Sequence, residues 1–373
     1  MHISILHNRD YDFLAEDPGR EARKDVARVA AALAHALTRD DISAEPIAVE
    51  NGTLAFAETL NSRQPILVVN LCESLAADSR GEMAIPCLLE LIGFPYTGSS
   101  ALALGLALHK DKAKELLRAR SVPTPEFSVL GRVEDAQMVD LRFPLIVKPV
   151  REDASVGVDF DSVVTDRPAL ARAVGKILST FHQPALVERY VEGREIYVSI
   201  LGNRPRQTLP LTEIQFGKTF EDRPKIVSYR AKWDLGSPEC VDSPAALCSL
   251  DAKSEERVVE TALAAFDALE CRDYGRVDLR LSAEGQPYVI DINPNCDLHP
   301  DAGFAKSAAA AGIDYPALAL RLVDIALERS YGNSSDRRQG PRATRRVAAP
   351  NRHVFAARSQ LRPRAHRPRA HFE

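Results

Sequence analysis

The sequence predicts an α/β protein built from two or three packed lobes. Its 373 residues are too many for a single hydrophobic core. Short apolar runs alternate with helical patterns through residues 1–100, which favours β-α-β units on a parallel sheet. The composition, with 45% hydrophobic and 27% charged residues, is that of an ordinary globular protein.

The first lobe is predicted to span residues 1–105. Residues 3–6 and 65–71 are apolar and of strand length, whereas residues 21–37 and 83–92 carry apolar residues at helical spacing. A further helical pattern at 108–120 ends before Pro123 and Pro125, which mark a lobe boundary.

Two more lobes follow, at residues 106–200 and 201–332. In the second, we expect strands at 143–148, 185–190 and 195–201 and a helix at 168–181. In the third, strands at 275–281 and 287–292 flank a hairpin turn at Gly285, and helices follow at 302–311 and 315–329.

The last segment, residues 333–373, is predicted to be a basic, disordered tail. Apolar periodicity stops there, and eleven Arg against two acidic residues give a formal charge of +9. The rest of the chain therefore carries −13, which argues against a nucleic-acid-binding body. The alternative for the tail is the binding of an anionic partner.

The chain shows no signal for a membrane or for a metal-cysteine cluster. No apolar run approaches the roughly 20 residues that cross a bilayer, and residues 1–6 resemble a strand rather than a signal peptide, so we expect a cytoplasmic protein. The six cysteines are scattered without a CxxC pair, which favours reduced thiols. A functional role stays open for Cys296 alone, because of the residues that neighbour it in the sequence.

The strongest chemical signal lies on two predicted strands. Alternate residues of a strand share a face, so Arg276 lies beside Asp278 and Asp291 beside Asn293. A hairpin brings the two pairs together. Carboxylate and amide oxygens suit Mg²⁺, and an arginine suits developing negative charge. The alternative is a solvated polar face of a hairpin.

Two weaker groups accompany this cluster. Lys148 ends an apolar strand, Lys112 lies in a helix, and a polar loop with Ser155 could close over phosphates, although lone lysines are usually solvated. A strand ending in Glu188, a link through Val191 and a strand starting at Glu195 form a candidate nucleotide clamp. The alternative for that segment is an ordinary strand–turn–strand.

Together and in this order, these segments resemble the ATP-grasp superfamily and, within it, the D-alanine–D-alanine ligase family. The resemblance runs from residue 1 to about 330. Its landmarks are residues 70–73 and 93–100, Asp111 with Lys112, residues 147–149 with Arg151, Glu152 and 155–157, then Glu188, Glu195 and residues 275–278.

The resemblance implies a three-domain ATP-grasp architecture, with a parallel-sheet first domain and two α+β lobes that clamp ATP. It also implies a reaction in which ATP phosphorylates a carboxylate and an amine displaces the phosphate to give an amide. By position, the phosphates would be contacted by Lys112, Lys148, Lys232 and the Ser155 loop, and the adenosine by Glu188, Val191 and Glu195. Two Mg²⁺ ions, or Mn²⁺, would be bound by Asp278, Asp291 and Asn293. Arg276 would stabilise the tetrahedral intermediate.

The chain departs from the family pattern where substrates are recognised. The family usually has two consecutive serines where this chain has Ala154 and Ser155, Tyr in place of Trp233, and Glu in place of Asp291. Glu21 is the candidate for an N-terminal Glu of the family. After Asn293 the family's Gly-containing turn and later Ser are missing, and we expect His299 and Asp301 to shape the amine pocket there.

Three functional hypotheses follow. The first is a ligase that joins small carboxylate and amine substrates, with D-alanine or with another amino acid or peptide pair. The second is a nucleotide-binding relative without turnover, which has less need of charge-stabilising groups such as Arg276. The third, nucleic-acid binding through the tail, lacks a recognisable module. A homodimer is an expectation from the family alone.

Overall fold

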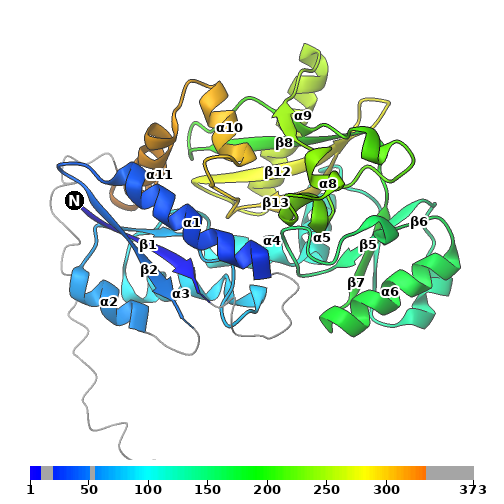
Figure 1. The fold of residues 1–373 in the computed structure, drawn as a ribbon, viewed down its shortest axis with the longest axis horizontal. Coiled ribbons are helices and arrows are strands. Elements are labelled where there is room, and N and C mark those ends of the chain that lie inside the picture. Colours follow the sequence, from blue (N-terminus) through cyan, green and yellow to red (C-terminus); the bar gives the residue numbers. More distant parts are fainter. Residues whose placement is uncertain (10–19, 51–54, 333–373) are drawn as a thin grey trace, which may run out of the picture. The chain divides into compact units, whose positions relative to one another are not determined.

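The computed structural model describes residues 1–9, 20–50 and 55–332, and these described residues belong to one compact unit. Three β-sheets organise this part of the chain (Figure 1). The predicted disordered tail, residues 333–373, lies outside the described residues. None of the helices in the described ranges is both long and apolar enough to cross a membrane.

The first sheet is parallel, as predicted. Its strand order is β2 (Ser43–Val49), β1 (His2–Asn8), β3 (Leu67–Asn70). Helices pack on both faces: α1 (Arg20–Leu37) and α11 (Tyr315–Tyr331) on one, α2 (Ala55–Arg63) and α3 (Ala84–Ile92) on the other. Both faces of β1 are therefore buried, which explains its nearly continuous apolar sequence.

The second sheet is antiparallel and has four strands. The order is β4 (Phe127–Leu130), β7 (Ala185–Arg189), β5 (Leu145–Pro149), β6 (Val163–Val164). Helix α6 (Arg167–Phe181) covers one face with Leu170, Val174 and Ile177. Asp166 caps this helix by accepting a hydrogen bond from the backbone N–H of Ala169.

The third sheet has six antiparallel strands. Its order is β11 (Ala245–Leu247), β10 (Thr212–Ile214), β8 (Arg194–Leu201), β12 (Tyr274–Leu281), β13 (Pro287–Asn293), with β9 (Gln207–Thr208) paired to β8. Helices α4 (Ala101–Leu108), α5 (Lys110–Ala119) and α9 (Ala252–Ala268) pack on its apolar face. The polar face is left to line a cavity.

Short helices complete the third lobe. They are α7 (Tyr229–Trp233), α8 (Pro238–Val241) and α10 (Gly303–Ala310). The predicted hairpin is confirmed: β12 pairs with β13, and Gly285 turns the chain at φ +74°.

The predicted strands and helices all have counterparts in the structure, but several elements were missed. Among them are β2, α2, β4, β9, β10, β11, α7, α8 and α9. The domain boundaries at 105 and 200 stay a prediction, because the described residues pack as one compact unit.

Candidate active site

A cavity of about 470 Å³ lies between the second and third sheets. That volume is typical of small-molecule sites. Most of the residues predicted from the sequence line it: Lys148, Ser155, Glu188, Val191, Glu195, Lys232, Arg276, Asp278, Asp291, Asn293 and Asp301. The structure therefore collects side chains from five strands, β5, β7, β8, β12 and β13, at one place.

The β12–β13 hairpin sets the acidic end of this cavity. Asp278 pairs directly with Asp291 across the ladder, and Arg276 with Asn293, as the alternation of the strands predicted. Arg276 donates from Nε and Nη2 to the two oxygens of Asp278 at 2.6 and 2.8 Å. Asn293 Nδ2 donates to Asp278 at 3.2 Å. The four predicted side chains thus meet at one place on the hairpin.

Burial governs the charge of this group. Burial raises the pKa of the Asp278 carboxyl, and its neighbour Asp291 adds to the rise, while Arg276 opposes it. Arg276 also lies over the ring of Tyr197, with its guanidinium carbon 4.4 Å from the ring centroid. The arginine is held in place from two sides.

Glu188 is the centre of a second group. Its side chain is 2% exposed and lies 2.6 Å from Nζ of both Lys148 and Lys114. Burial alone would raise the pKa of Glu188, but the two lysines outweigh it and lower the pKa. The predicted clamp residue therefore holds two phosphate-binding candidates side by side, and sequence reasoning missed Lys114.

A third lysine, Lys110, connects the loop that contains Asp153 to the β12–β13 hairpin. Its Nζ lies 2.7 Å from Asp153 and 3.1 Å from Asp291. Burial opposes the charge of this lysine, yet the two carboxylates raise its pKa. Burial would raise the pKa of Asp291, but Lys110 and Lys148 lower it.

The placement of Lys112 corrects the sequence prediction. Its side chain is 53% exposed, pairs with Glu115, and lies outside the cavity lining. Residues 110 and 114 lie four apart on one face of α5, whereas residue 112 lies on the opposite face. Helical spacing groups Lys110 with Lys114 on one face and Lys112 on the other, but the sequence does not say which of the two faces is buried.

Glu195 lies at the third-sheet side of the cavity. It accepts a hydrogen bond from the Tyr197 hydroxyl at 2.9 Å and lies 3.6 Å from Arg280. Burial raises the pKa of the Glu195 carboxyl. Arg280 lines the same cavity and was also missed.

The loop that carries Ser155 covers part of the cavity. Trp233 Nε1 donates to the carbonyl oxygen of Ala154 at 3.0 Å and so links helix α7 to this loop. Ala154 and Ser155 have φ of +54° and +61°, and Gly157 has +81°. A Cβ at Gly157 would come within 3 Å of Pro149 and Phe181, so glycine is required there.

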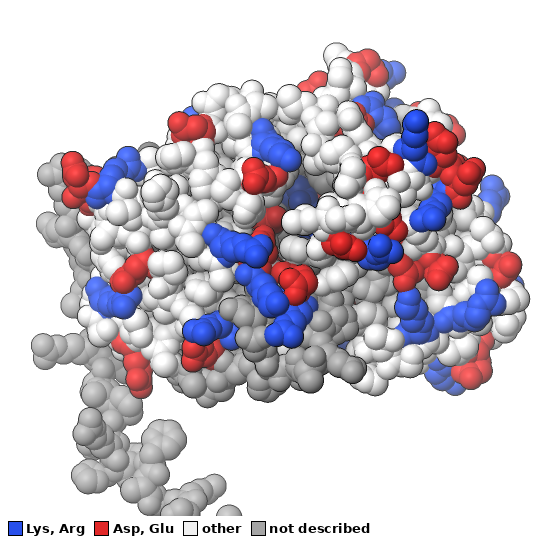
Figure 2. Space-filling model, viewed as in Figure 1, with Lys and Arg blue, Asp and Glu red and all other residues white. Residues whose placement is uncertain are grey.

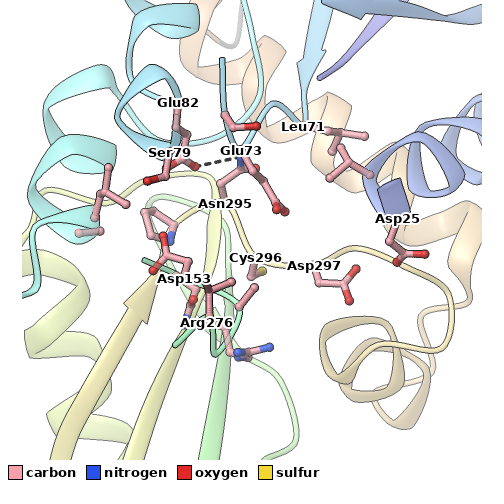
Figure 3. Close-up of a pocket in the computed structure, with 18 of the residues that line it drawn as sticks. Asp25, Leu71, Glu73, Ser79, Glu82, Asp153, Arg276, Asn295, Cys296 and Asp297 are labelled. Atoms are coloured by element: carbon pink, nitrogen blue, oxygen red, sulfur yellow. Dashed lines mark hydrogen bonds between the residues drawn. The ribbon is translucent and has the colours of Figure 1, made fainter. Parts of the chain in front are cut away.

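A second, smaller cavity of about 100 Å³ adjoins the first (Figure 3). Both cavities are lined by Lys232, Arg276 and Asp297. The first lobe contributes Asp25 and Glu73 to it, and the segment after β13 contributes Cys296 and Asp297. Burial raises the pKa of the Cys296 thiol to about 12, so this cysteine is a neutral wall of the cavity.

Two of the predicted substrate residues lie elsewhere. Glu21 is exposed on α1 and pairs with Lys24, whereas Asp25, about one turn further on, lines the smaller cavity. His299 accepts a hydrogen bond from the backbone N–H of Asp301 and lines neither cavity. Asp301 lines the larger cavity with a side chain that is 89% exposed.

The donor set suits Mg²⁺ better than a metal held by protein alone. The described part of the chain contains no group of three or more His, Cys, Asp or Glu side chains that could hold a metal ion. Asp278, Asp291 and Asn293 supply two carboxylates and an amide oxygen in one place. Mg²⁺ typically takes one or two carboxylates and completes its shell with water and substrate phosphates. These residues fit such an ion.

Comparison with known proteins places this arrangement in a family. The family model described as the D-ala D-ala ligase C-terminus matches residues 116–324. A D-alanine–D-alanine ligase of Chromohalobacter salexigens is 31% identical over 82% of this chain and 91% of its own length. An uncharacterized protein of Sinorhizobium fredii is 38% identical over 76% of this chain and 83% of its own.

A solved structure agrees in fold. The D-alanine–D-alanine ligase of Bacillus anthracis, solved in complex with ATP, covers 88% of this chain and 98% of its own with a TM-score of 0.67 at 22% identity. A parallel-sheet lobe followed by two antiparallel sheets around a shared cavity is the ATP-grasp architecture. The chain belongs to the D-alanine–D-alanine ligase family. The expected class of enzyme, an ATP-dependent carboxylate–amine ligase, is thereby confirmed.

Proposed function

We propose that this chain uses ATP and Mg²⁺ to convert a small carboxylate into an acyl phosphate and to join it to an amine. The observation that carries the proposal is the larger cavity, where lysines, two carboxylates, an amide and an arginine meet between two sheets. The family relation supports the same reaction.

The lysines are the proposed phosphate-binding groups. Lys148 and Lys114 are held against Glu188, and Lys232 lies at the junction of the two cavities. ATP brings negative charge that competes with Glu188 and Asp153 for the cations around them. Fixed, buried lysines neutralise the charge on a transferring phosphoryl group without reorganising during the reaction.

The acidic end of the cavity is the proposed metal site. Asp278, Asp291 and Asn293 would hold Mg²⁺, which would neutralise charge on the phosphates. The carboxylate oxygen then bonds to the γ-phosphorus as the bond to ADP breaks. Next, the amine nitrogen bonds to the acyl carbon, the C–O bond to phosphate breaks, and the amine loses a proton.

Arg276 is the proposed catalytic cation of the second step. It lines both cavities and is fixed by Asp278 and Tyr197. An oxyanion develops on the acyl carbon when the amine adds. A guanidinium already oriented by neighbours stabilises that charge at little reorganisation cost.

The test is phosphate release from ATP and Mg²⁺ with a panel of D- and L-amino acids and short peptides, including D-alanine. Wild type is expected to release phosphate with one pair and to form the matching amide, detected by mass spectrometry. In Asp278→Asn the rate of phosphate release should fall at least about 100-fold, which corresponds to roughly 2.7 kcal/mol of transition-state stabilisation. Glu134→Gln, at an exposed position outside both cavity linings, should match wild type.

Two results would overturn the proposal. One is phosphate release that proceeds without amide formation for every pair in the panel. The other is equal activity in wild type and Asp278→Asn.

A further inference from the structure

The smaller cavity carries more carboxylates than the reaction needs. Six acidic residues line it, and two cationic residues, Lys232 and Arg276, face them. The six are Asp25, Glu73, Glu82, Glu152, Asp153 and Asp297. Several of these acids have partners outside the lining, among them Asp25 with Arg28 and Asp153 with Lys110. An ordinary amino acid carries one ammonium and one carboxylate, so it brings no net positive charge to Glu82 and Asp297.

Glu82 is the carboxylate with the clearest need of a cationic ligand. The residue is 8% exposed, and its side chain accepts a hydrogen bond at 3.2 Å from Nδ2 of Asn295, a neutral amide. Within the described residues no cation lies in ion-pair range of Glu82. A buried carboxylate without a counter-ion is costly, and such groups are usually paired.

Asp297, which is half-buried, is a second carboxylate of this cavity with a neutral partner. Its Oδ1 accepts the backbone N–H of His299 at 2.7 Å, and among the residues described here it has no ion-pair partner. By contrast, Asp153 is paired with Lys110, and Asp25 with Arg28. Figure 3 shows Glu73, Asp297 and Asp25 around the same opening, with Arg276 and Cys296 close to it. Two carboxylates therefore line the cavity with neutral partners.

The size of the cavity limits the ligand. At roughly 10–15 Å³ for each water-sized position, about 100 Å³ holds about seven to ten such positions. Ornithine and norvaline are both of about this size, so charge rather than volume has to separate a basic amino acid from a neutral one. Lys232 and Arg276 both line this cavity and would be available to a substrate carboxylate there.

We infer that this cavity selects an amino acid that carries a second amino group, such as ornithine or lysine, and that Glu82 is the residue that determines this specificity. The inference rests on the proposed ligase function and names the substrate class of its site. The α-ammonium and the side-chain ammonium of such a substrate compensate Glu82 and Asp297. The neutral amide of Asn295 keeps Glu82 turned toward the ligand.

The experiment compares basic amino acids with neutral ones of similar shape. Phosphate release and amide formation are measured with ornithine against norvaline and with lysine against norleucine, as D and L isomers. Wild type is expected to use one basic amino acid with a kcat/KM at least about tenfold above its neutral counterpart. Glu82→Gln, which keeps the shape and the Asn295 contact, should remove most of that preference while leaving the KM for ATP unchanged. Glu134→Gln is the matched control.

Calorimetric binding of ornithine and norvaline separates the two proposals. Tighter binding of ornithine to wild type, lost in Glu82→Gln, supports the specificity inference even without turnover. Amide formation that favours norvaline or alanine, or that is the same in Glu82→Gln, overturns the inference and leaves the ligase function standing. Equal binding of ornithine and norvaline to wild type also overturns it.

Discussion

Glu188 shows how single residues prepare the site. It is buried between Lys114 and Lys148 and keeps two cations close together in a place where their mutual repulsion would otherwise separate them. ATP has to draw the lysines from this carboxylate toward its phosphates. Glu188 thus compensates two buried lysines, and in the proposed function it also sets how strongly these lysines bind phosphate.

Replacement of Glu188 by Gln leaves two buried lysines without this counter-ion. We expect a loss of about 3–5 kcal/mol in the free energy of unfolding at pH 7, the usual cost of breaking a buried pair. Because the pKa of Glu188 is lowered in the folded state, this contribution is present above its ordinary value of 4.5 and is lost as pH falls below it. Denaturant melts from pH 7 to pH 3 measure the difference between the two proteins. A constant difference over that range would contradict this role of Glu188.

For Glu82 we expect the free energy of unfolding to depend on pH in the sense opposite to that for Glu188. Burial and the nearby Asp153 raise its pKa well above the ordinary 4.5, so the folded state takes up a proton there before the unfolded state does. The free energy of unfolding contributed by this residue therefore rises as pH falls from neutral toward 4.5. Glu82→Gln should be about 1–3 kcal/mol more stable than wild type at pH 8, with a gain that shrinks toward pH 5. Denaturant melts of both proteins at these two pH values measure the gain. A gain in stability that grows on acidification would contradict the raised pKa of Glu82.

At the scale of elements, helix α5 separates its lysines by face. Lys110 and Lys114 are buried toward the site, and Lys112 points to solvent. Lys114→Ala is expected to weaken ATP binding by roughly 10–100-fold, the cost of about 1.5–3 kcal/mol for a charged hydrogen bond. Lys112→Ala should leave the dissociation constant for ATP unchanged. Calorimetric titration of both variants with ATP measures the two dissociation constants. Equal weakening in the two variants would restore Lys112 as a candidate site residue.

The hairpin cluster and Lys148 were predictable from sequence, whereas Lys110 and Lys114 were not. Period-two alternation fixes which residues share a strand face, so the amino-acid sequence alone was enough to group Arg276, Asp278, Asp291 and Asn293. A helix in which Lys110, Lys112 and Lys114 follow one another gives three candidates, and only packing decides which face is buried. The structure therefore places Lys112 outside the cavity lining, and its contact with ATP stays a prediction.

Elements were missed where local signals were weak. Strand β2 contains Pro46 and is half exposed, and β11 has only three residues. Helix α9 starts with charged residues and shows its apolar face only after Val258. Pairing partners and tertiary packing select these segments, and neither is local information.

At the scale of the whole molecule, one buried carboxylate links distant parts of the chain. Asp273, fully buried, accepts hydrogen bonds from the backbone N–H of Gly98, from Asn203 and from Arg329 on α11. The last helix is thereby fixed to both the first lobe and the third sheet. This arrangement holds the first-lobe wall of the smaller cavity, with Asp25 and Glu82, against the segment that carries Asp297.

The class of protein was predictable from the sequence, as were Lys232, Arg276 and Asn293 in the smaller cavity, but the first-lobe wall of that cavity was not. Glu82 lies on a segment far from Asn295 in sequence, and their contact depends on the packing of two lobes. Glu21 was predicted in place of Asp25 because a helix register cannot be placed against a distant cavity by sequence alone. Basic and acidic side chains are interspersed on the face drawn in Figure 2, which therefore offers no uniformly basic surface to nucleic acid among the described residues.

In the proposed reaction the carboxylate is phosphorylated before the amine attacks. The most direct measurement uses the active amino acid with ¹⁸O in its carboxylate and follows the released phosphate by mass spectrometry. We predict one ¹⁸O atom in phosphate for every amide bond formed, because the acyl C–O bond breaks after the oxygen has bonded to phosphorus. Amide formation with unlabelled phosphate would contradict this order of steps.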